Sequence, residues 1–151
     1  MPDTFTHIAL PFVTQKIFKR PLIFPLVLIG TVLPDYFREI FTYFLPLEYY
    51  PAVLTFHAIT GVILTSLLLT SFFNVSIRKS VFISLTFGQL IHLFFDSIQY
   101  YLCGESIYVF LPIWKSFKIG LISETYWIYL FIFSSILFIA YIIFTLKKRA
   151  N

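Results

Sequence analysis

The sequence predicts an all-α integral membrane protein, built as a bundle of four to five membrane helices. Of its 151 residues, 59% are hydrophobic and only 12% are charged, whereas soluble domains carry about 25% charged residues. The mean hydropathy is +0.88, and long apolar runs alternate with short basic clusters. Because no polar linker divides the chain, we expect residues 1–151 to form a single domain.

Five apolar segments follow one another along the chain. The first, 5–18, is the weakest, and the second, 22–44, contains Pro34. Proline removes a helical hydrogen bond, so we expect the helix to kink or end there. The other three segments are 51–73, 81–103 and 126–146, and each has the length of about 20 residues that a membrane span needs.

Charge and aromatic residues predict one topology. Eight of the eleven basic residues lie in clusters at 16–20, 78–79 and 147–149, which the positive-inside rule places in the cytoplasm. Aromatic residues gather at the opposite interface: Tyr49, Tyr50, Tyr100, Tyr101, Tyr108, Trp114, Tyr126 and Trp127. The basic clusters are too short to follow a phosphate backbone, so we expect no nucleic-acid partner.

Five ionisable residues lie in or beside these apolar segments, among them all three histidines of the chain. They are His7, Asp35, His57, His92 and Asp96. A charged residue at the centre of a membrane helix costs about 2.5–3.5 kcal/mol. With the N-terminus outside, the helical rise places all five roughly 18–26 Å from the cytoplasmic helix ends. Because His and Asp bind divalent metals, the sequence predicts one polar, metal-bearing site between helices.

The neighbourhood of these residues leaves several roles open. His92 and Asp96 are four residues apart and share a helix face, so they can supply two metal ligands or one ligand and its supporting carboxylate. Gly88 on the same segment permits close approach of another helix. Asp35 could instead cap a helix end. Arg38 could pair with Asp35 or bind an anionic substrate.

Five stretches carry a resemblance to a known family: 6–7, 30–35, 57–60, 88–97 and 110–120. The chain resembles the membrane-bound metal-dependent hydrolases, which include LexA-regulated inner-membrane hydrolases of bacteria. The resemblance implies a multi-pass helical protein of the bacterial inner membrane with a divalent metal, zinc above all. It also implies the metal ligands, which are His7, Asp35, His57, His92 and Asp96.

The chain departs from the family pattern at two of these stretches. Phe37 and Arg38 replace an aspartate and a histidine after the Pro-Asp pair, and Ala58 replaces an arginine. Gly61 and Val62 follow where the family often has His-Ser. We therefore expect one metal ion rather than two.

Together these features predict a metal-dependent hydrolase at the outer face of the membrane, with membrane lipid as its surroundings. The resembled family is distantly similar to zinc-dependent phospholipases C, which implies a phosphoester or lipid-linked substrate attacked by a metal-activated water. Asp35 or Asp96 could act as general base, and Arg38, Lys115 and Lys118 could attract a phosphate. Two alternatives remain, an inactive structural membrane protein on the same scaffold and a metal or proton carrier. The carrier is disfavoured because the inner half of the spans reads as almost purely apolar.

Overall fold

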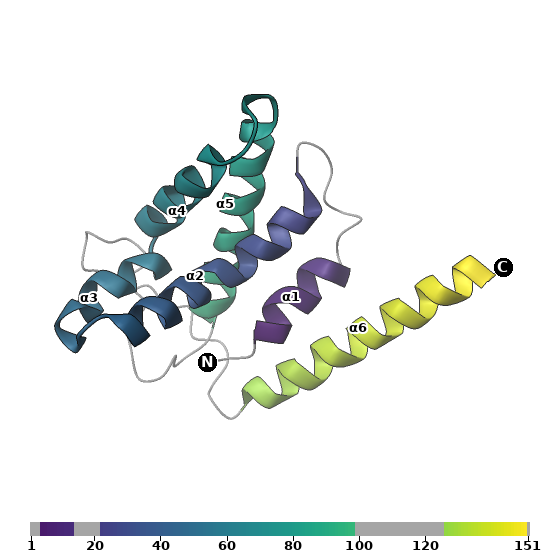
Figure 1. Ribbon diagram of the computed structural model, residues 1–151. Coiled ribbons are helices and arrows are strands. Elements are labelled where there is room, and N and C mark those ends of the chain that lie inside the picture. Colours follow the sequence, from purple (N-terminus) through teal and green to yellow (C-terminus); the bar gives the residue numbers. More distant parts are fainter. Residues whose placement is uncertain (1–3, 14–21, 99–125, 151) are drawn as a thin grey trace.

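The computed structural model describes residues 4–13, 22–98 and 126–150, and all regular structure within these ranges is helical (Figure 1). The all-α prediction is therefore confirmed for this part of the chain. The α-helices are α1 (Thr4–Val13), α2 (Phe24–Phe44), α3 (Tyr50–Val53), α4 (Ile59–Ser71), α5 (Val75–Ile98) and α6 (Trp127–Ala150). Two short 3₁₀ helices, η2 (Leu47–Tyr49) and η3 (Leu54–His57), flank α3.

Within the described ranges, two helices rather than four to five are long and apolar enough to cross a membrane. These are Val75–Ile98 in α5 and Ile128–Lys147 in α6. Helix α2 has 21 residues, but every stretch of span length in it contains the three charged residues Asp35, Arg38 and Glu39. Helices α1 and α4 have only 10 and 13 residues, short of the roughly 20 that a bilayer requires.

The predicted span 51–73 is not one continuous helix. The chain becomes extended at Ala58, with φ −122° and ψ 158°, and α4 begins only at Ile59. Gly61 packs directly on the preceding turn, because a Cβ added there would lie 2.0 Å from the carbonyl oxygen of Thr55. This break ends η3 at His57, so the imidazole stands at a bend between two helical segments.

Helices α2 and α5 run parallel, with a constant offset of 61 residues. The amide of Ile23 donates to Ser84 Oγ at 2.7 Å, and the next pairing along the helices joins Thr31 O to His92 Nδ1 at 2.8 Å. Pro34 lies inside α2 and does not end it. The parallel register pairs the amino-terminal half of α2 with the carboxyl-terminal half of α5.

Two glycines allow this close approach. A Cβ added to Gly88 would lie 2.1 Å from the carbonyl oxygen of Val27, and one added to Gly30 would lie 2.6 Å from that of Leu85. Contacts this short exclude any side chain larger than hydrogen. The close approach predicted for Gly88 therefore occurs, with Gly30 of α2 as its partner.

Helix α5 also packs against α4, and a buried polar network joins them. The side-chain amide of Gln89 donates to Ser66 Oγ at 2.8 Å, and its oxygen accepts from Thr65 Oγ1 at 2.8 Å. Thr70 and Ser84 are buried nearer the helix ends. The expectation of an almost purely apolar inner half was therefore wrong. The hydrogen bonds among the uncharged side chains of Thr65, Ser66 and Gln89 join α4 to α5.

Helix α6 packs along α1 at the edge of the bundle (Figure 1). The ring of Phe138 contacts Phe5 and Phe12 of α1, with centroid distances of 5.5 and 5.2 Å. Thr6 Oγ1 lies 3.2 Å from Ser134 Oγ. The rest of α6 presents exposed aliphatic and aromatic side chains along most of its length. Helix α1 therefore lies between α6 and the remainder of the bundle.

Candidate metal centre

The structure brings the five ionisable residues singled out in the sequence into one buried cluster. His7 comes from α1, Asp35 from α2 and His57 from the end of η3, while His92 and Asp96 lie one turn apart on α5. No member of the cluster is more than 7% exposed. Residues up to 89 positions apart in sequence (His7 to Asp96) thus share one polar centre inside an apolar bundle.

Three of the five form a compact group. His57 Nε2 lies 3.1 Å from Asp35 Oδ1 and 3.4 Å from His92 Nε2, and His92 Nε2 lies 3.7 Å from Asp35 Oδ1. Two nitrogen ligands about 2.05 Å from a tetrahedral zinc ion are roughly 3.3 Å apart. The group formed by Asp35, His57 and His92 could therefore hold a metal ion.

The hydrogen bonding of His92 supports its role as a possible metal ligand. Its Nδ1 lies 2.8 Å from the carbonyl oxygen of Thr31, which can only accept, so Nδ1 carries the proton of the neutral ring. The lone pair of Nε2 then faces the carboxylates of Asp96 and Asp35 and the ring of His57. Electron pairs that converge in a buried site need a shared cation, either a proton or a metal ion.

Asp96 and His7 flank this group on one side. Asp96 Oδ2 lies 3.0 Å from His92 Nε2, whereas Oδ1 faces His7 Nε2 at 3.5 Å. The His7 ring stacks on that of His92, with centroids 4.5 Å apart. Oδ2 also lies 3.9 Å from His57 Nε2. Asp96 therefore contacts both histidines of the three-residue group through Oδ2 and links them to His7 through Oδ1.

An aromatic stack fixes the segment that carries His57. The ring of Phe56 is nearly parallel to Phe41, at 5.0 Å and 5°, and to Phe37, at 5.4 Å and 19°. Both partners belong to α2, the helix of Asp35. Phe37 thus adds packing next to the cluster. This stack holds His57 against Asp35.

Arg38 lies beside the cluster rather than in it. Asp35 pairs with His57 and His92, and no ion pair joins Arg38 to Asp35 or Glu39 among the described residues. Asp35 is also not a helix cap, because it is buried within α2. Lys115 and Lys118, the other cations predicted near the site, lie outside the described residues.

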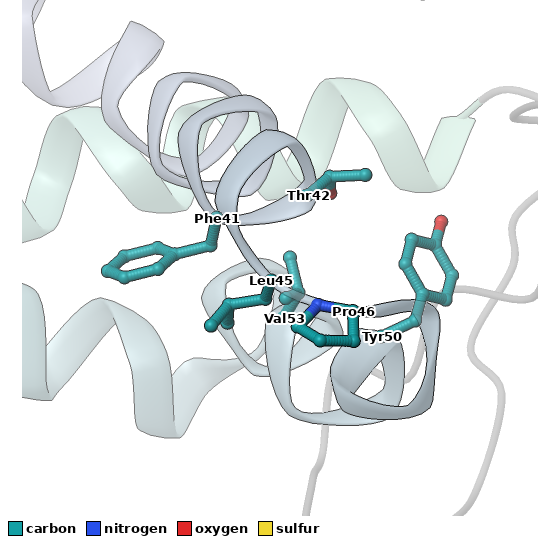
Figure 2. A pocket seen from close by; sticks show the side chains of 6 residues that line it. All are labelled: Phe41, Thr42, Leu45, Pro46, Tyr50 and Val53. Atoms are coloured by element: carbon teal, nitrogen blue, oxygen red, sulfur yellow. The ribbon is translucent and has the colours of Figure 1, made fainter.

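The side chain of Arg38 borders a surface hollow of about 370 Å³ at the end of α2. The residues that line it are Arg38, Glu39, Thr42, Tyr43 and Tyr50. A smaller cavity of about 10 Å³, with room for a single water, adjoins it where α2 meets α3 (Figure 2). Its lining is Phe41, Thr42, Leu45, Pro46, Tyr50 and Val53.

Sequence reasoning missed the role of Thr31 at this site. The residue acts through its backbone carbonyl, and no side-chain pattern marks a backbone atom as the partner of a distant histidine. The aromatic stack on Phe56 was missed for a similar reason, since twenty phenylalanines in the chain give no signal of which will meet.

Comparison of the chain with known protein families, curated proteins and solved structures found no match. The class of this protein is therefore described from its own fold and its own candidate site. In its described part the protein is a helical bundle with two helices apolar enough to span a membrane. A buried aspartate and two histidines at the centre of this bundle could hold a metal ion.

Proposed function

We propose that this chain is an integral membrane metal-dependent hydrolase that cleaves a phosphoester or lipid-linked substrate at the outer face of the membrane. The observation that supports this most directly is the three-residue group of Asp35, His57 and His92. Structural zinc sites are closed by four protein ligands, whereas catalytic sites use three and leave a position for water. The resemblance to membrane-bound metal-dependent hydrolases favours the same activity.

In this proposal Asp35 Oδ1, His57 Nε2 and His92 Nε2 hold a zinc ion. A bound zinc ion would supply a Lewis acid that polarises the phosphoryl group and lowers the pKa of a bound water. The carbonyl of Thr31 keeps Nε2 of His92 directed into the site. Burial of the cluster excludes bulk water and strengthens each of these interactions.

Asp96 is better placed than Asp35 to act as general base. Both carboxylates lie near His57 and His92, but Asp35 belongs to the group that could hold the metal and would be occupied as a ligand. Asp96 adjoins that group through Oδ2, while Oδ1 is directed toward His7. A proton taken from water at Asp96 would thus be held next to an imidazole that can share it.

The proposed location is the bacterial inner membrane, with several passes of the chain. Helix α6 exposes apolar side chains on most of its surface, more than a soluble monomer normally leaves in contact with water. A lipid environment covers such a helix without cost. His92 lies thirteen residues beyond Lys79 on α5, which places the site roughly 20 Å from the predicted cytoplasmic end.

The first test is the metal content of detergent-purified protein, measured by mass spectrometry. We expect about one zinc per chain, a value that follows from a single three-ligand site. Asp35→Ala, His57→Ala and His92→Ala should each lose the metal, while Glu48→Gln, a change at an exposed acid outside the cluster, should keep it. A stable wild-type protein that takes up no divalent metal after reconstitution would contradict the proposal.

The second test separates a hydrolase from an inactive scaffold. Short-chain phospholipids are incubated with the zinc-loaded protein, and release of the phosphorylated headgroup is measured before and after chelation. Asp96→Asn should retain zinc and lose turnover. Full zinc occupancy without hydrolysis of any phosphoester would favour the inactive structural protein. For the carrier alternative, the buried polar residues of α4 and α5 on the far side of Gln89 supply hydroxyl groups but no buried charge.

A further inference from the structure

The surface hollow beside the candidate metal centre has its own chemistry. Resting on the proposed function, we infer that it binds a phosphate-linked amine, the zwitterionic headgroup of a phosphoethanolamine type, and so selects the substrate. The lining carries one cation, Arg38, and one anion, Glu39, together with three hydroxyl groups. Such a surface has no net charge and favours a ligand that carries both signs.

Arg38 is the phosphate-binding group. It follows Asp35 by three residues on α2, so the two side chains lie on neighbouring parts of one helix face, about 4.5 Å apart along the axis. Its guanidinium forms no ion pair with any described residue. A planar guanidinium binds phosphate oxygens in a two-pronged manner. Among the residues that line the hollow, Arg38 is the nearest along α2 to Asp35 of the three-residue group.

The other residues that line the hollow suit an amine. Glu39 supplies a carboxylate, and the rings of Tyr43 and Tyr50 supply aromatic faces that attract ammonium groups. Figure 2 shows the side chains of Thr42 and Tyr50 on the same side of the corner between α2 and α3. The volume of about 370 Å³ lies within the usual range of ligand pockets, about 300–1,000 Å³.

Exposed aromatic side chains at, or next in sequence to, the lining residues favour a lipid as the source of this headgroup. Tyr43, Phe44 and Tyr49 are 85%, 73% and 51% exposed. Tyrosine and other amphipathic rings gather at the headgroup level of membranes. A lipid would thus present its headgroup to the hollow while its chains remain in the bilayer. Free phosphoethanolamine shares the same recognition chemistry.

The test is equilibrium binding to the detergent-solubilised full chain. The radiolabelled probes are dihexanoyl phosphatidylethanolamine, dihexanoyl phosphatidylglycerol and free phosphoethanolamine. We expect the ethanolamine lipid to bind about tenfold more tightly than the glycerol lipid, the effect of one charge-assisted contact. Glu39→Gln should abolish this preference, and Arg38→Gln should weaken binding of all three probes about tenfold. Lys79→Gln, an exposed charge change on α5, is the matched control.

Equal binding of the two lipids by wild type, or unchanged binding in both hollow variants, would overturn the inference. Equal affinity for free phosphoethanolamine and for the lipid would support the shared chemistry and identify a soluble ligand. Zinc content is measured in every sample. Full zinc without headgroup preference contradicts only this inference, whereas headgroup preference in a protein that binds no zinc contradicts only the metal-dependent activity.

Discussion

The carbonyl oxygen of Thr31 lies 2.8 Å from Nδ1 of His92, so a backbone atom of α2 orients a side chain of α5. The same offset of 61 residues joins Ile23 to Ser84 nearer the start of both helices. The register of two parallel helices therefore decides which nitrogen of His92 faces the cluster. An imidazole held in this way keeps Nε2 directed into the candidate metal centre.

Two substitutions at His92 separate its structural and ligand roles. His92→Asn keeps an N–H donor near the position of Nδ1 but removes the nitrogen that faces Asp35 and His57. We expect it to lose zinc binding while its free energy of unfolding falls little. His92→Leu also loses the hydrogen bond to Thr31, which should cost about 1 kcal/mol more. Metal analysis and thermal unfolding in detergent measure the two effects.

Equal zinc content in His92→Asn and wild type would show that Nε2 of His92 is not a ligand. Equal stability of the two variants would instead show that the contact with Thr31 adds nothing to the fold. The asparagine and leucine variants serve as controls for each other, because both remove the imidazole ring.

Gly88→Ala should separate α2 from α5. The new Cβ would lie 2.1 Å from the carbonyl oxygen of Val27, a contact with backbone that no rotamer change relieves. We expect a loss of about 3 kcal/mol in the free energy of unfolding, the upper part of the usual range for overpacking. Zinc binding should also weaken, since the same helix pair carries Asp35 and His92. Leu90→Ala, on the half-exposed side of α5, should leave zinc binding unchanged.

Gln89→Leu should lower stability without affecting the metal centre. The substitution preserves approximate volume but removes the hydrogen bonds to Thr65 and Ser66. The Thr65 hydroxyl keeps its bond to the Gly61 carbonyl, but the buried Ser66 hydroxyl loses its amide donor, which should cost about 1–3 kcal/mol. In the double variant with Ser66→Ala the two losses should not add, because both changes remove one contact. Thermal unfolding of the four proteins gives the coupling, and strict additivity would contradict a direct interaction.

The all-α fold class and the identity of the five cluster residues could be predicted from the sequence. Both depend on the spacing of apolar and ionisable residues along single segments. The four-residue spacing of His92 and Asp96 requires only that α5 be a helix, and the apolar composition of residues 75–98 ensures that. The break before α4 was not predictable in this way. It depends on Phe56 packing against α2 and on Gly61 packing against Thr55. An apolar run such as 51–73 carries no periodicity that would reveal such contacts.

The arrangement within the cluster could be predicted only in part. Depth along each helix indicated that the five residues share a layer, and they do meet. Which three form the tight group follows from side-chain directions, which depth does not specify. Asp96 faces both His92 and His7, and nothing in the H-x-x-x-D spacing distinguishes this position from that of a ligand.

A disulfide cross-link would test the packing that places His7 in the cluster. Thr6, the neighbour of His7, meets Ser134 of α6 with hydroxyl oxygens 3.2 Å apart. In a Cys103→Ser background, which removes the one native cysteine, Thr6→Cys with Ser134→Cys should therefore cross-link readily under mild oxidation. A gel-mobility shift reversed by reductant measures the bond.

Thr6→Cys with Phe133→Cys is the control. It should not cross-link, because Phe133 is 55% exposed and lies on a different face of α6. Cross-linking of the control pair, or none in the test pair, would show that α6 does not hold α1 in this register, and His7 would then lose its support beside Asp96.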